Sequence, residues 1–513
     1  MPADAIEAAQ ADATEAVGAI WAKNGGIYFG LTVAPQAKPD RPLEGKESEA
    51  SVAPNVKIKT TWRRGEGEHF YSSDRHVLTV GPNGSGKTRK LLMPNLFRLR
   101  DWSCVVIDPK GELAAHTAVF RASQPGHRVI VLDPFEVIEK NYPRLFAKHR
   151  ELFKSHRCNP LAALDPHSPL FVDDAKALAL ALIKTDHSRD AYWPMAAQAM
   201  IKGLLMAMRI KYETRASLGG LRDILGRHPK VLARYNYDRV REFGEQFPAI
   251  AASLNEFTTY NSDDRELNAI RRTAKVQTDW LDSPAIRLDL EGPALQFATL
   301  KERPTTIYLV LPPERLASHG VWLRLMVTSI LLPLMRSVEV APVPVLLMLD
   351  EFAQLGHMEV IQSNYALMRG FGVKLWTIWQ DLTQAKRLYH DQWESFISNA
   401  GIVHAFAPQD LTTRDYLSKL SGERIMWHSK TSVSSNLALR GGLTMGSSQN
   451  DVNIVESVMK PHELAALDQD EAVLFTRRGL RHLTILPQPE LLPGVGEALQ
   501  AARRDIEDAS PVS

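Results

Sequence analysis

The stretch Val77-Leu-Thr-Val-Gly-Pro-Asn-Gly-Ser-Gly-Lys-Thr88 decides the fold. Its first four residues are typical of a buried strand, and a glycine-rich loop follows them at once. Such glycines turn backbone N–H groups toward phosphate oxygens, while the lysine reaches the β- and γ-phosphates and the threonine offers a hydroxyl to Mg²⁺. A chance glycine-rich turn is disfavoured, because the complete pattern stands between a strand and a helix. The predicted phosphate-binding residues are Gly81, Pro82, Asn83, Gly84, Ser85, Gly86, Lys87 and Thr88.

A second motif supplies the carboxylates that a phosphate loop needs. The apolar run Val345–Leu349 ends directly in Asp350 and Glu351. We predict that Asp350 holds the Mg²⁺ shell together with Thr88, and that Glu351 orients and deprotonates the attacking water. Simple turn chemistry is the alternative for an acidic pair after a strand. The two motifs together predict an ATPase whose cofactors are ATP and Mg²⁺.

Gln380 is a third candidate site residue, directly after the predicted strand Lys374–Ile378 and Trp379. A polar side chain at the end of a neighbouring strand can sense the γ-phosphate or position the water. A capping or loop amide is the alternative, and the sequence leaves it open.

The fold class follows from short runs rich in Val, Ile and Leu, which are typical of strands buried on both faces of a mainly parallel sheet. These runs are Val77–Val80, Cys104–Ile107, Val129–Leu132, Thr306–Leu311, Val345–Leu349, Lys374–Ile378 and Val403–Phe406. Helical stretches separate most of them, which predicts a doubly wound α/β domain. Strand signals largely stop between about residues 162 and 284, where the spacing predicts an inserted all-α domain. Its predicted helices are Val172–Ile183, Met195–Tyr212, Leu218–Leu225, Val231–Phe243 and Ala249–Asn255.

The chain of 513 residues divides into five predicted parts. A short helix, Ala5–Trp21, and a Pro-, Glu- and Ser-rich linker, 34–55, are expected at the start. The Ser-, Asn- and Gly-rich residues 425–455 predict a mobile loop. The parts are 1–55 (N-terminal segment and linker), 56–161 (nucleotide-binding domain, first part), 162–284 (all-α domain), 285–490 (nucleotide-binding domain, second part) and 491–513 (poorly ordered tail).

Composition leaves several classes of partner open. The net charge is +2, from 61 Lys+Arg against 59 Asp+Glu, so bulk charge neither requires nor excludes nucleic acid. The two cysteines, Cys104 and Cys158, predict neither a disulfide framework nor a metal site, and they fit a reducing cytosol. The most apolar candidate span, Trp322–Met335, is too short for a membrane helix and contains Arg324. We therefore expect a chain that does not cross a membrane by its own sequence.

Further short motifs follow the phosphate loop in a specific joint order, although each is weak alone. They are Ile107-Asp-Pro-Lys-Gly-Glu-Leu113, Val131-Leu-Asp-Pro134, Asn159-Pro-Leu161, Tyr192-Trp193 with Ala196-Ala197, Ile307-Tyr-Leu-Val-Leu-Pro312, Leu349-Asp-Glu-Phe-Ala-Gln-Leu-Gly356, Arg369-Gly-Phe-Gly372, Ile378-Trp-Gln380 with Gln384, Asn399, and Tyr416-Leu417 with Gly422. Over most of residues 70–485 the sequence thereby resembles the type IV secretion coupling proteins, the TraG-like ATPases of conjugation.

The resemblance implies a RecA-like P-loop NTPase domain with an all-α domain inserted in it. It also implies a homo-hexameric ring with ATP sites between subunits. The implied partners are DNA, relaxase–DNA or effector protein cargo, and the components of a type IV secretion channel. Family members usually begin with two membrane-spanning helices, which this sequence lacks. Either a separate anchor protein holds it at the inner face of the bacterial cytoplasmic membrane, or it works as a soluble cytoplasmic motor.

Two more residues are candidates for the site. In a ring, Arg369 could reach the neighbour's γ-phosphate as an arginine finger, and a surface salt bridge is the alternative. Asp108, after another predicted strand, could help to order Mg²⁺ or contact a neighbour's nucleotide. The alternative for Asp108 is a helix cap.

Three functions stay open on the sequence. The leading hypothesis is an ATP-driven coupling motor that recruits cargo and delivers it to a type IV secretion or conjugation channel. The second is a soluble hexameric DNA translocase or helicase that acts outside secretion. The third is a nucleotide-dependent recruitment hub whose helical domain binds cargo.

Overall fold

The structure, a computed structural model, describes residues 25–32, 68–185, 191–336, 342–438, 442–476 and 481–507. The predicted helix Ala5–Trp21 and the predicted linker 34–55 lie outside the described residues.

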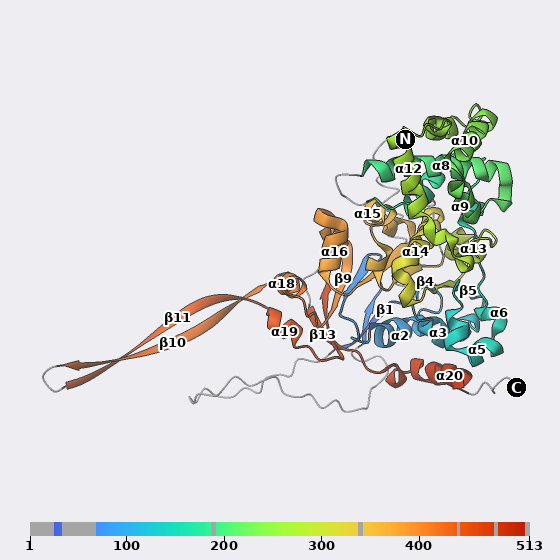
Figure 1. Cartoon of the computed structure of the whole chain (residues 1–513). Coiled ribbons are helices and arrows are strands. Elements are labelled where there is room, and N and C mark those ends of the chain that lie inside the picture. The colour runs from blue at the N-terminus through green and yellow to red at the C-terminus, as the bar shows by residue number, and fades with distance from the viewer. Residues whose placement is uncertain are drawn as a thin grey trace, which may run out of the picture.

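The main sheet contains eleven strands among the described residues (Figure 1). The strands from β9 to β5 pair in parallel. On the other side of β9, the strands β12, β13, β1 and β2 extend the sheet with antiparallel pairing. From edge to edge the strands are β2 (Glu68–Tyr71), β1 (Ile27–Thr32), β13 (Arg481–Ile485), β12 (Glu471–Thr476), β9 (Ala400–Phe406), β3 (His76–Val80), β8 (Val373–Trp379), β7 (Val345–Leu349), β4 (Ser103–Ile107), β6 (Thr305–Leu309) and β5 (Arg128–Leu132).

All seven strands predicted from the sequence are present, and the mainly parallel α/β fold is confirmed. Every residue of β3, β4, β6, β7, β8 and β9 is buried, which explains why these strands read as continuous apolar runs. Neighbouring residues of one strand enter two different hydrophobic clusters, as Val77 and Leu78 of β3 do. Helices therefore pack against both faces of the sheet.

The helices that accompany the sheet connect its strands or follow them. They are η1 (Lys87–Leu92), α2 (Met93–Arg98), α3 (Glu112–Ala122), α4 (Val137–Asn141), α5 (Pro143–Lys148), α6 (Arg150–Phe153), α14 (Pro313–Leu334), η7 (Phe352–Leu355), α15 (Glu359–Asn364), η8 (Met368–Phe371), α16 (Leu382–Tyr389), η9 (His390–Gln392), α17 (Glu394–Asn399), α18 (Leu411–Leu420), α19 (Pro461–Ala465), η10 (Pro489–Leu491) and α20 (Val495–Glu507).

Between β5 and β6 the described chain holds helices and no strand, and all five helices predicted there are present. We call the part from α7 to α13 the helical block; its helices α8, α10 and α12 lie at the top of Figure 1. The boundaries 162–284 proposed for it stay a prediction. The helices from η2 onward are η2 (Pro160–Ala163), α7 (Phe171–Leu182), α8 (Tyr192–Tyr212), η3 (Glu213–Arg215), α9 (Leu218–Gly226), α10 (Pro229–Phe243), α11 (Pro248–Leu254), η4 (Asn255–Phe257), α12 (Arg265–Gln277), η5 (Asp279–Asp282), α13 (Pro284–Asp289) and η6 (Phe297–Lys301).

The prediction of a mobile loop at 425–455 is wrong. The chain there forms two antiparallel strands, β10 (Glu423–Ala438) and β11 (Gly442–Ser457), which pair in one register from Glu423 opposite Ser457 to Ala438 opposite Gly442. The stretch contains no proline, so nothing interrupts the ladder of backbone hydrogen bonds. The prediction was wrong because it relied on the side-chain types Ser, Asn and Gly, whereas the strand pairing is made by backbone hydrogen bonds. The hairpin projects from the body (Figure 1).

The prediction of a poorly ordered tail after 491 is also wrong, because α20 follows there. Its buried residues Val495 and Leu499 join the hydrophobic cluster that α2 and α3 form beneath the sheet. Lys148 of α5 pairs with Asp505 at 2.5 Å and holds the other end. An amphipathic helix is stabilised when its apolar face packs against other elements, and for α20 these are α2 and α3, which are distant in the sequence.

Helix α14 is longer than the apolar segment Trp322–Met335 that the sequence suggested. Its 22 residues are long and apolar enough to cross a membrane, with a mean hydropathy of 1.3 over a window of 18 residues. However, 67% of that window is buried inside the protein, and the helix packs against α7, η6 and η7. These contacts make it a core helix.

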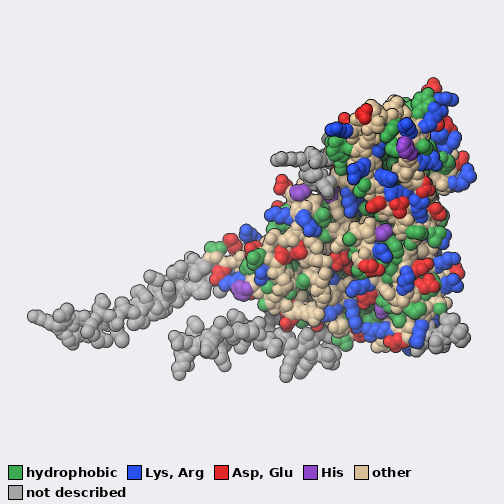
Figure 2. Space-filling view, in the orientation of Figure 1, with side chains coloured by type: hydrophobic (Ala, Val, Ile, Leu, Met, Phe, Trp, Pro, Cys, Tyr) green, Lys and Arg blue, Asp and Glu red, His purple; other side chains and the backbone are tan. Residues whose placement is uncertain are grey.

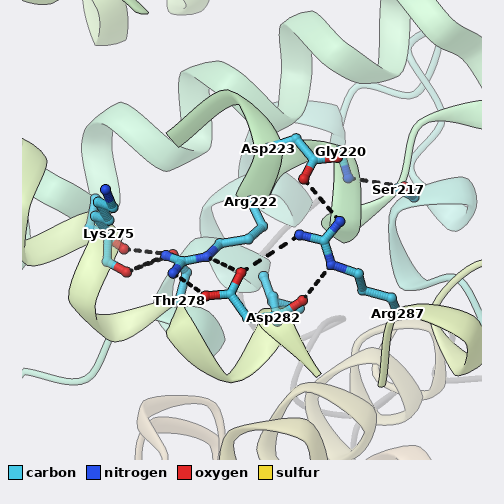
Figure 3. Close-up of polar contacts among 10 residues, drawn as sticks. Ser217, Gly220, Arg222, Asp223, Lys275, Thr278, Asp282 and Arg287 are labelled. Carbon is cyan, nitrogen blue, oxygen red and sulfur yellow. Dashed lines mark hydrogen bonds and ion pairs between the residues drawn. The ribbon is translucent and has the colours of Figure 1, made fainter. Parts of the chain in front are cut away.

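A network of ion pairs and hydrogen bonds joins α9, α12, η5 and α13 of the helical block (Figure 3). Arg222 of α9 donates from Nε to Asp282 Oδ1 at 2.8 Å, and its Nη2 pairs with the other oxygen of the same carboxylate. Its Nη1 donates to Lys275 O at the end of α12 at 2.5 Å. Arg287 of α13 lies 2.9 Å from Asp223 and 3.7 Å from Asp282. The bidentate contact with Arg222 lowers the pKa of Asp282.

We predict that Asp282→Asn loosens this junction. The buried guanidinium of Arg222 would lose its carboxylate, which should destabilise the contact of α9 with α12 by about 1 kcal/mol. Amide hydrogen exchange in α9 and α12 should become several-fold faster. Since the pKa of Asp282 is lowered, the stabilisation is present at neutral pH and is lost as the pH falls through that lowered pKa.

Asp223→Asn is the matched control for this experiment. Asp223 forms an ion pair with Arg287, but that guanidinium is more exposed than Arg222. Equal exchange rates in the two variants would show that the fork between Arg222 and Asp282 does not hold the block together.

Candidate nucleotide-binding site

The predicted site residues meet at one edge of the sheet. β3, β8, β7 and β4 are neighbours and run parallel, so their carboxyl ends lie side by side. These ends carry Gly81, Gln380, Asp350 and Asp108 in that order. A cleft of about 640 Å³ opens here, lined by the phosphate loop, both acidic residues after β7, Gln380 and the start of α14. An edge of this kind is where ligands bind in open α/β folds.

The phosphate loop has the backbone geometry that its sequence predicts. Gly84 and Gly86 adopt left-handed conformations with φ of 81° and 80°, which residues with a Cβ rarely reach. Lys87 donates from Nζ to Gly81 O at 2.5 Å and to Pro82 O at 2.8 Å, so its ammonium lies within the curve of the loop. Burial lowers the pKa of Lys87, and the carboxylates after β7 oppose that shift. A loop with this ammonium at its centre fits a polyphosphate.

Hydroxyl and carboxylate oxygens come together beside the loop. Thr88 Oγ1 donates to Asp350 Oδ2 at 3.3 Å. Asp350 is buried, and burial together with the nearby Glu351 raises its pKa to about 6, although Lys87 opposes the shift. Hard oxygen ligands of this type fit Mg²⁺, which also binds phosphates directly. The positions of Thr88 and Asp350 are therefore compatible with their predicted role as metal ligands.

Gln380 holds the neighbouring carboxylate. Its Nε2 donates to Glu351 Oε2 at 2.8 Å. Glu351 has a left-handed backbone with φ of 53°, unusual for a residue that is not glycine, and it lines the cleft. The sequence analysis considered Gln380 for contact with the γ-phosphate or the water. The geometry adds a direct contact with Glu351, which fixes the orientation of one carboxylate oxygen.

Asp108 caps a helix. Its Oδ2 accepts a hydrogen bond from Ala114 N at 2.8 Å, at the start of α3. Burial raises the pKa of this carboxyl to about 7, and the backbone hydrogen bonds oppose the shift. Of the three roles considered for Asp108, the geometry favours the helix cap over ordering Mg²⁺ or contacting a neighbour's nucleotide, although the residue also lines the cleft.

Arg369 lies at the opposite edge of the sheet. It belongs to η8, directly before β8, whereas Gln380 follows the end of that strand. Seven residues of extended chain separate them, roughly 23 Å at about 3.3 Å per residue. The charge of Arg369 is felt instead by His76 at the start of β3. Arg369 therefore does not reach the cleft of its own chain, and its role toward a neighbouring subunit stays a prediction.

The sequence analysis missed three residues that hold the phosphate loop from the C-terminal part of the chain. Gln469 donates from Nε2 to Gly84 O at 3.2 Å. Asp470 pairs with Lys90, and Glu490 pairs with Arg89 in the first turn after the loop. These contacts span 385, 380 and 401 residues. No local pattern could have found them, because separations of this size are closed by the sheet alone.

Fold and site together define a P-loop nucleotide-binding protein of the RecA-like α/β class. Residues 39–479 match the model of the family described as "Type IV secretory system Conjugative DNA transfer". The chain belongs to this family, so the resemblance noted in the sequence is confirmed.

Curated relatives include the conjugal transfer protein TraG of Escherichia coli, 26% identical over 393 residues, which cover 70% of this chain and 58% of the relative. The type IV secretion system-coupling protein VirD4 of Bartonella henselae is 23% identical over 81% of this chain and 64% of its own. The chain thus spans a little under three fifths of the length of that TraG protein.

A solved structure of the bacterial conjugative coupling protein TrwBΔN70 is similar with a TM-score of 0.59 and 15% identity, covering 81% of this chain and 85% of that one. The plasmid coupling protein TrwB in complex with ADP and Mg²⁺ is similar with a TM-score of 0.52 and 14% identity, covering 81% and 85%. At this identity the likeness shows a common fold.

We predict that Asp470→Ala weakens nucleotide binding. Lys90 is nearly buried and would lose its carboxylate, so the turn after the phosphate loop would gain freedom that a bound nucleotide must remove. The Kd for a fluorescent ATP analogue should rise about 3- to 10-fold, by roughly 0.7–1.4 kcal/mol. The rate of hydrolysis at saturation should change far less.

Asp468→Ala is the control, because Asp468 lies in the same turn and contacts Glu471 rather than Lys90. If both variants bind the analogue as wild type does, Asp470 does not support the loop.

Proposed function

We propose that this protein is an ATP-hydrolysing coupling motor that recruits DNA, relaxase–DNA or effector protein cargo and delivers it to a type IV secretion channel. One observation carries the proposal. In a member of the conjugative DNA transfer family, the phosphate loop, Asp350 and the Glu351–Gln380 pair face one cleft. Such an arrangement serves phosphoryl transfer to water.

The chemistry assigns one task to each side chain. Lys87 neutralises charge on the β- and γ-phosphates, and the loop N–H groups hold the remaining oxygens. Thr88 and Asp350 would hold Mg²⁺, which supplies further positive charge to the phosphates when it is bound. Glu351 takes a proton from the attacking water, and Gln380 keeps one oxygen of that carboxylate in place.

A ring of six copies would complete the site. The basic side chains that line the cleft among the described residues are Lys87, Lys110 and the partly exposed Arg89. Arg89 forms an ion pair with Glu490. A neighbour's Arg369 would then supply charge to the γ-phosphate in the transition state, a contribution typically of about 10³- to 10⁵-fold in rate. Hydrolysis would depend on assembly, and each event would be coupled to cargo movement in the ring.

The helical block is proposed as the cargo-binding part, because its sequence contains no phosphate-binding glycine loop. On the face shown in Figure 2, basic and acidic side chains are interspersed over the body. Recognition of cargo would then depend on local groups and not on bulk charge. The proposed location is the cytoplasm, at the inner face of the bacterial cytoplasmic membrane when a separate anchor protein and the channel are present.

We predict that Lys87→Ala abolishes DNA transfer in the native host and weakens ATP binding in vitro, because the phosphates lose a buried counter-ion. Glu351→Gln should keep ATP binding but lower turnover at least about 100-fold, since the proton acceptor is lost. Conjugation frequency, nucleotide binding and phosphate release measure the three effects.

Lys110→Ala provides the control, because it removes an exposed ammonium at the rim of the same cleft. It should affect transfer far less than Lys87→Ala. Wild-type turnover in Glu351→Gln would exclude Glu351 as the base. DNA-stimulated hydrolysis without any effect on transfer would favour a translocase that acts outside secretion.

We further predict that Arg369 acts in the site of the neighbouring subunit. Arg369→Ala should bind ATP normally and barely hydrolyse it, and wild-type activity per subunit should rise steeply with protein concentration. Mixing Arg369→Ala with Lys87→Ala should restore part of the activity, because some interfaces then combine an intact loop with an intact Arg369.

Arg387→Ala, on α16, is the control. Its mixture with Lys87→Ala should hydrolyse ATP at the same rate as a mixture of wild type with Lys87→Ala. A hydrolysis rate per subunit that is independent of concentration would argue against the trans role.

A further inference from the structure

A groove separate from the nucleotide cleft lies where α7 of the helical block meets α14 and α15. It has a volume of about 280 Å³. Its lining comes from α14 (Arg324, Thr328 and Leu332) with Met335 directly after it, and from residues of α7 and α15. Figure 1 shows α14 and α15 as neighbours above the sheet. The apolar lining comes from Ala177, Leu180, Leu332, Met335, Met358 and Val360.

The groove has a buried cation at one end. Arg324 is only 3% exposed and lines the groove. Its Nε donates to Ala181 O at 2.6 Å, and its Nη2 is buried without a hydrogen-bond partner among the described residues. Burial lowers the pKa of this guanidinium to about 10. A buried charge without a counter-ion is costly.

Arg121 is a buried arginine that the chain itself satisfies, whereas the buried Arg271 also has nitrogens without a hydrogen-bond partner among the described residues. Arg121 is fully buried. Its three nitrogens donate to Thr306 Oγ1 and to the carbonyl oxygens of Leu96, Leu99 and Trp102 at 2.5–3.0 Å. Arg324 makes one such bond where Arg121 makes four. Arg324 differs in that it lines the groove, but its Nη2 is enclosed, so a carboxylate in the groove would reach that nitrogen only after a shift of the side chain.

The acidic groups near the groove do not fill this role. Asp173 and Glu359 line it, but both are exposed at its rim, and neither forms an ion pair with Arg324. Asp174 pairs with Arg336, beyond the end of α14. The groove therefore offers an unpaired guanidinium at its base and an aliphatic surface beside it.

We propose that this groove binds a carboxylate attached to a short aliphatic body, with the carboxylate on Arg324 and the aliphatic part between α7, α14 and α15. A planar carboxylate matches the donor geometry of a guanidinium, and the apolar walls exclude water from the contact. A free aliphatic acid and the C-terminal residue of a peptide both present this chemistry.

The full chain would be titrated calorimetrically with hexanoate and with its neutral analogue hexanamide. Hexanoate should bind and hexanamide should not, because only the former carries the charge. Arg324→Met should weaken hexanoate binding roughly 10- to 100-fold, as expected for loss of charge-assisted hydrogen bonds. Acetyl-Gly-Gly-Leu with a free and with an amidated C-terminus forms the second arm. Binding of the free peptide alone would identify a chain terminus as the source, and binding of hexanoate as well would include free acids.

Two further variants keep the test decisive. Arg336→Met removes an arginine beside the groove that already has a carboxylate partner, and it should leave hexanoate binding unchanged. Ala177→Leu fills the groove without touching the guanidinium, and it should weaken binding even if Arg324→Met does not fold. Without ligand, Arg324→Met should be no less stable to urea than wild type, since it removes an uncompensated charge.

The proposal is overturned if neither hexanoate nor the free peptide binds at millimolar concentration, or if hexanamide binds as well as hexanoate. It is also overturned if a folded Arg324→Met, or Ala177→Leu, binds hexanoate like wild type.

Discussion

The parallel pairing of β3 with β8, of β8 with β7 and of β7 with β4 is the constraint on which the rest of this structure depends. It places four chain turns at one sheet edge, so groups up to 297 residues apart in the sequence, from Asn83 to Gln380, share one cleft. The contact between Thr88 and Asp350 spans 262 residues and follows directly from this register. The candidate site residues thus stand at the ends of fully buried strands, where position is least variable.

The C-terminal part of the chain also contacts the phosphate loop and η1 at this edge of the sheet. Asp470 and Glu490 engage consecutive residues of η1, and Gln469 contacts the loop itself. β12 follows Gln469 and Asp470 in the chain and pairs with β9, which is the neighbour of β3 in the sheet. α20 follows Glu490 and packs beneath the sheet. The β10–β11 hairpin stands immediately before this C-terminal part in the chain. The phosphate loop and the C-terminal part of the chain are therefore joined by direct contacts around η1.

The buried charges differ in how the fold treats them, and the difference separates structure from binding. Arg121 and Asp108 are buried with backbone partners, so each one ties elements together. Asp350 is buried among groups that suit a metal and a polyphosphate. Arg324 is buried beside a groove with most of its donors unused among the described residues. The lining of a groove by Arg324 is what distinguishes it from the other buried polar groups that lack a partner among the described residues.

The sequence by itself determined the strands of the parallel sheet, five helices of the helical block, the phosphate loop and the acidic pair. These are local patterns. A strand buried on both faces requires consecutive apolar residues, helical spacing repeats within a few residues, and a phosphate loop needs a fixed order of glycines. Only the tertiary structure decided the orientation of Gln380 toward Glu351, the cap role of Asp108, the placement of Arg369 at the far edge, and the support of η1 by Asp470 and Glu490. The hairpin and α20 also escaped the sequence analysis, because a ladder of backbone bonds and an amphipathic face acquire meaning only with their partners. Such partners are chosen by the packing of the whole chain, which no local window of sequence contains.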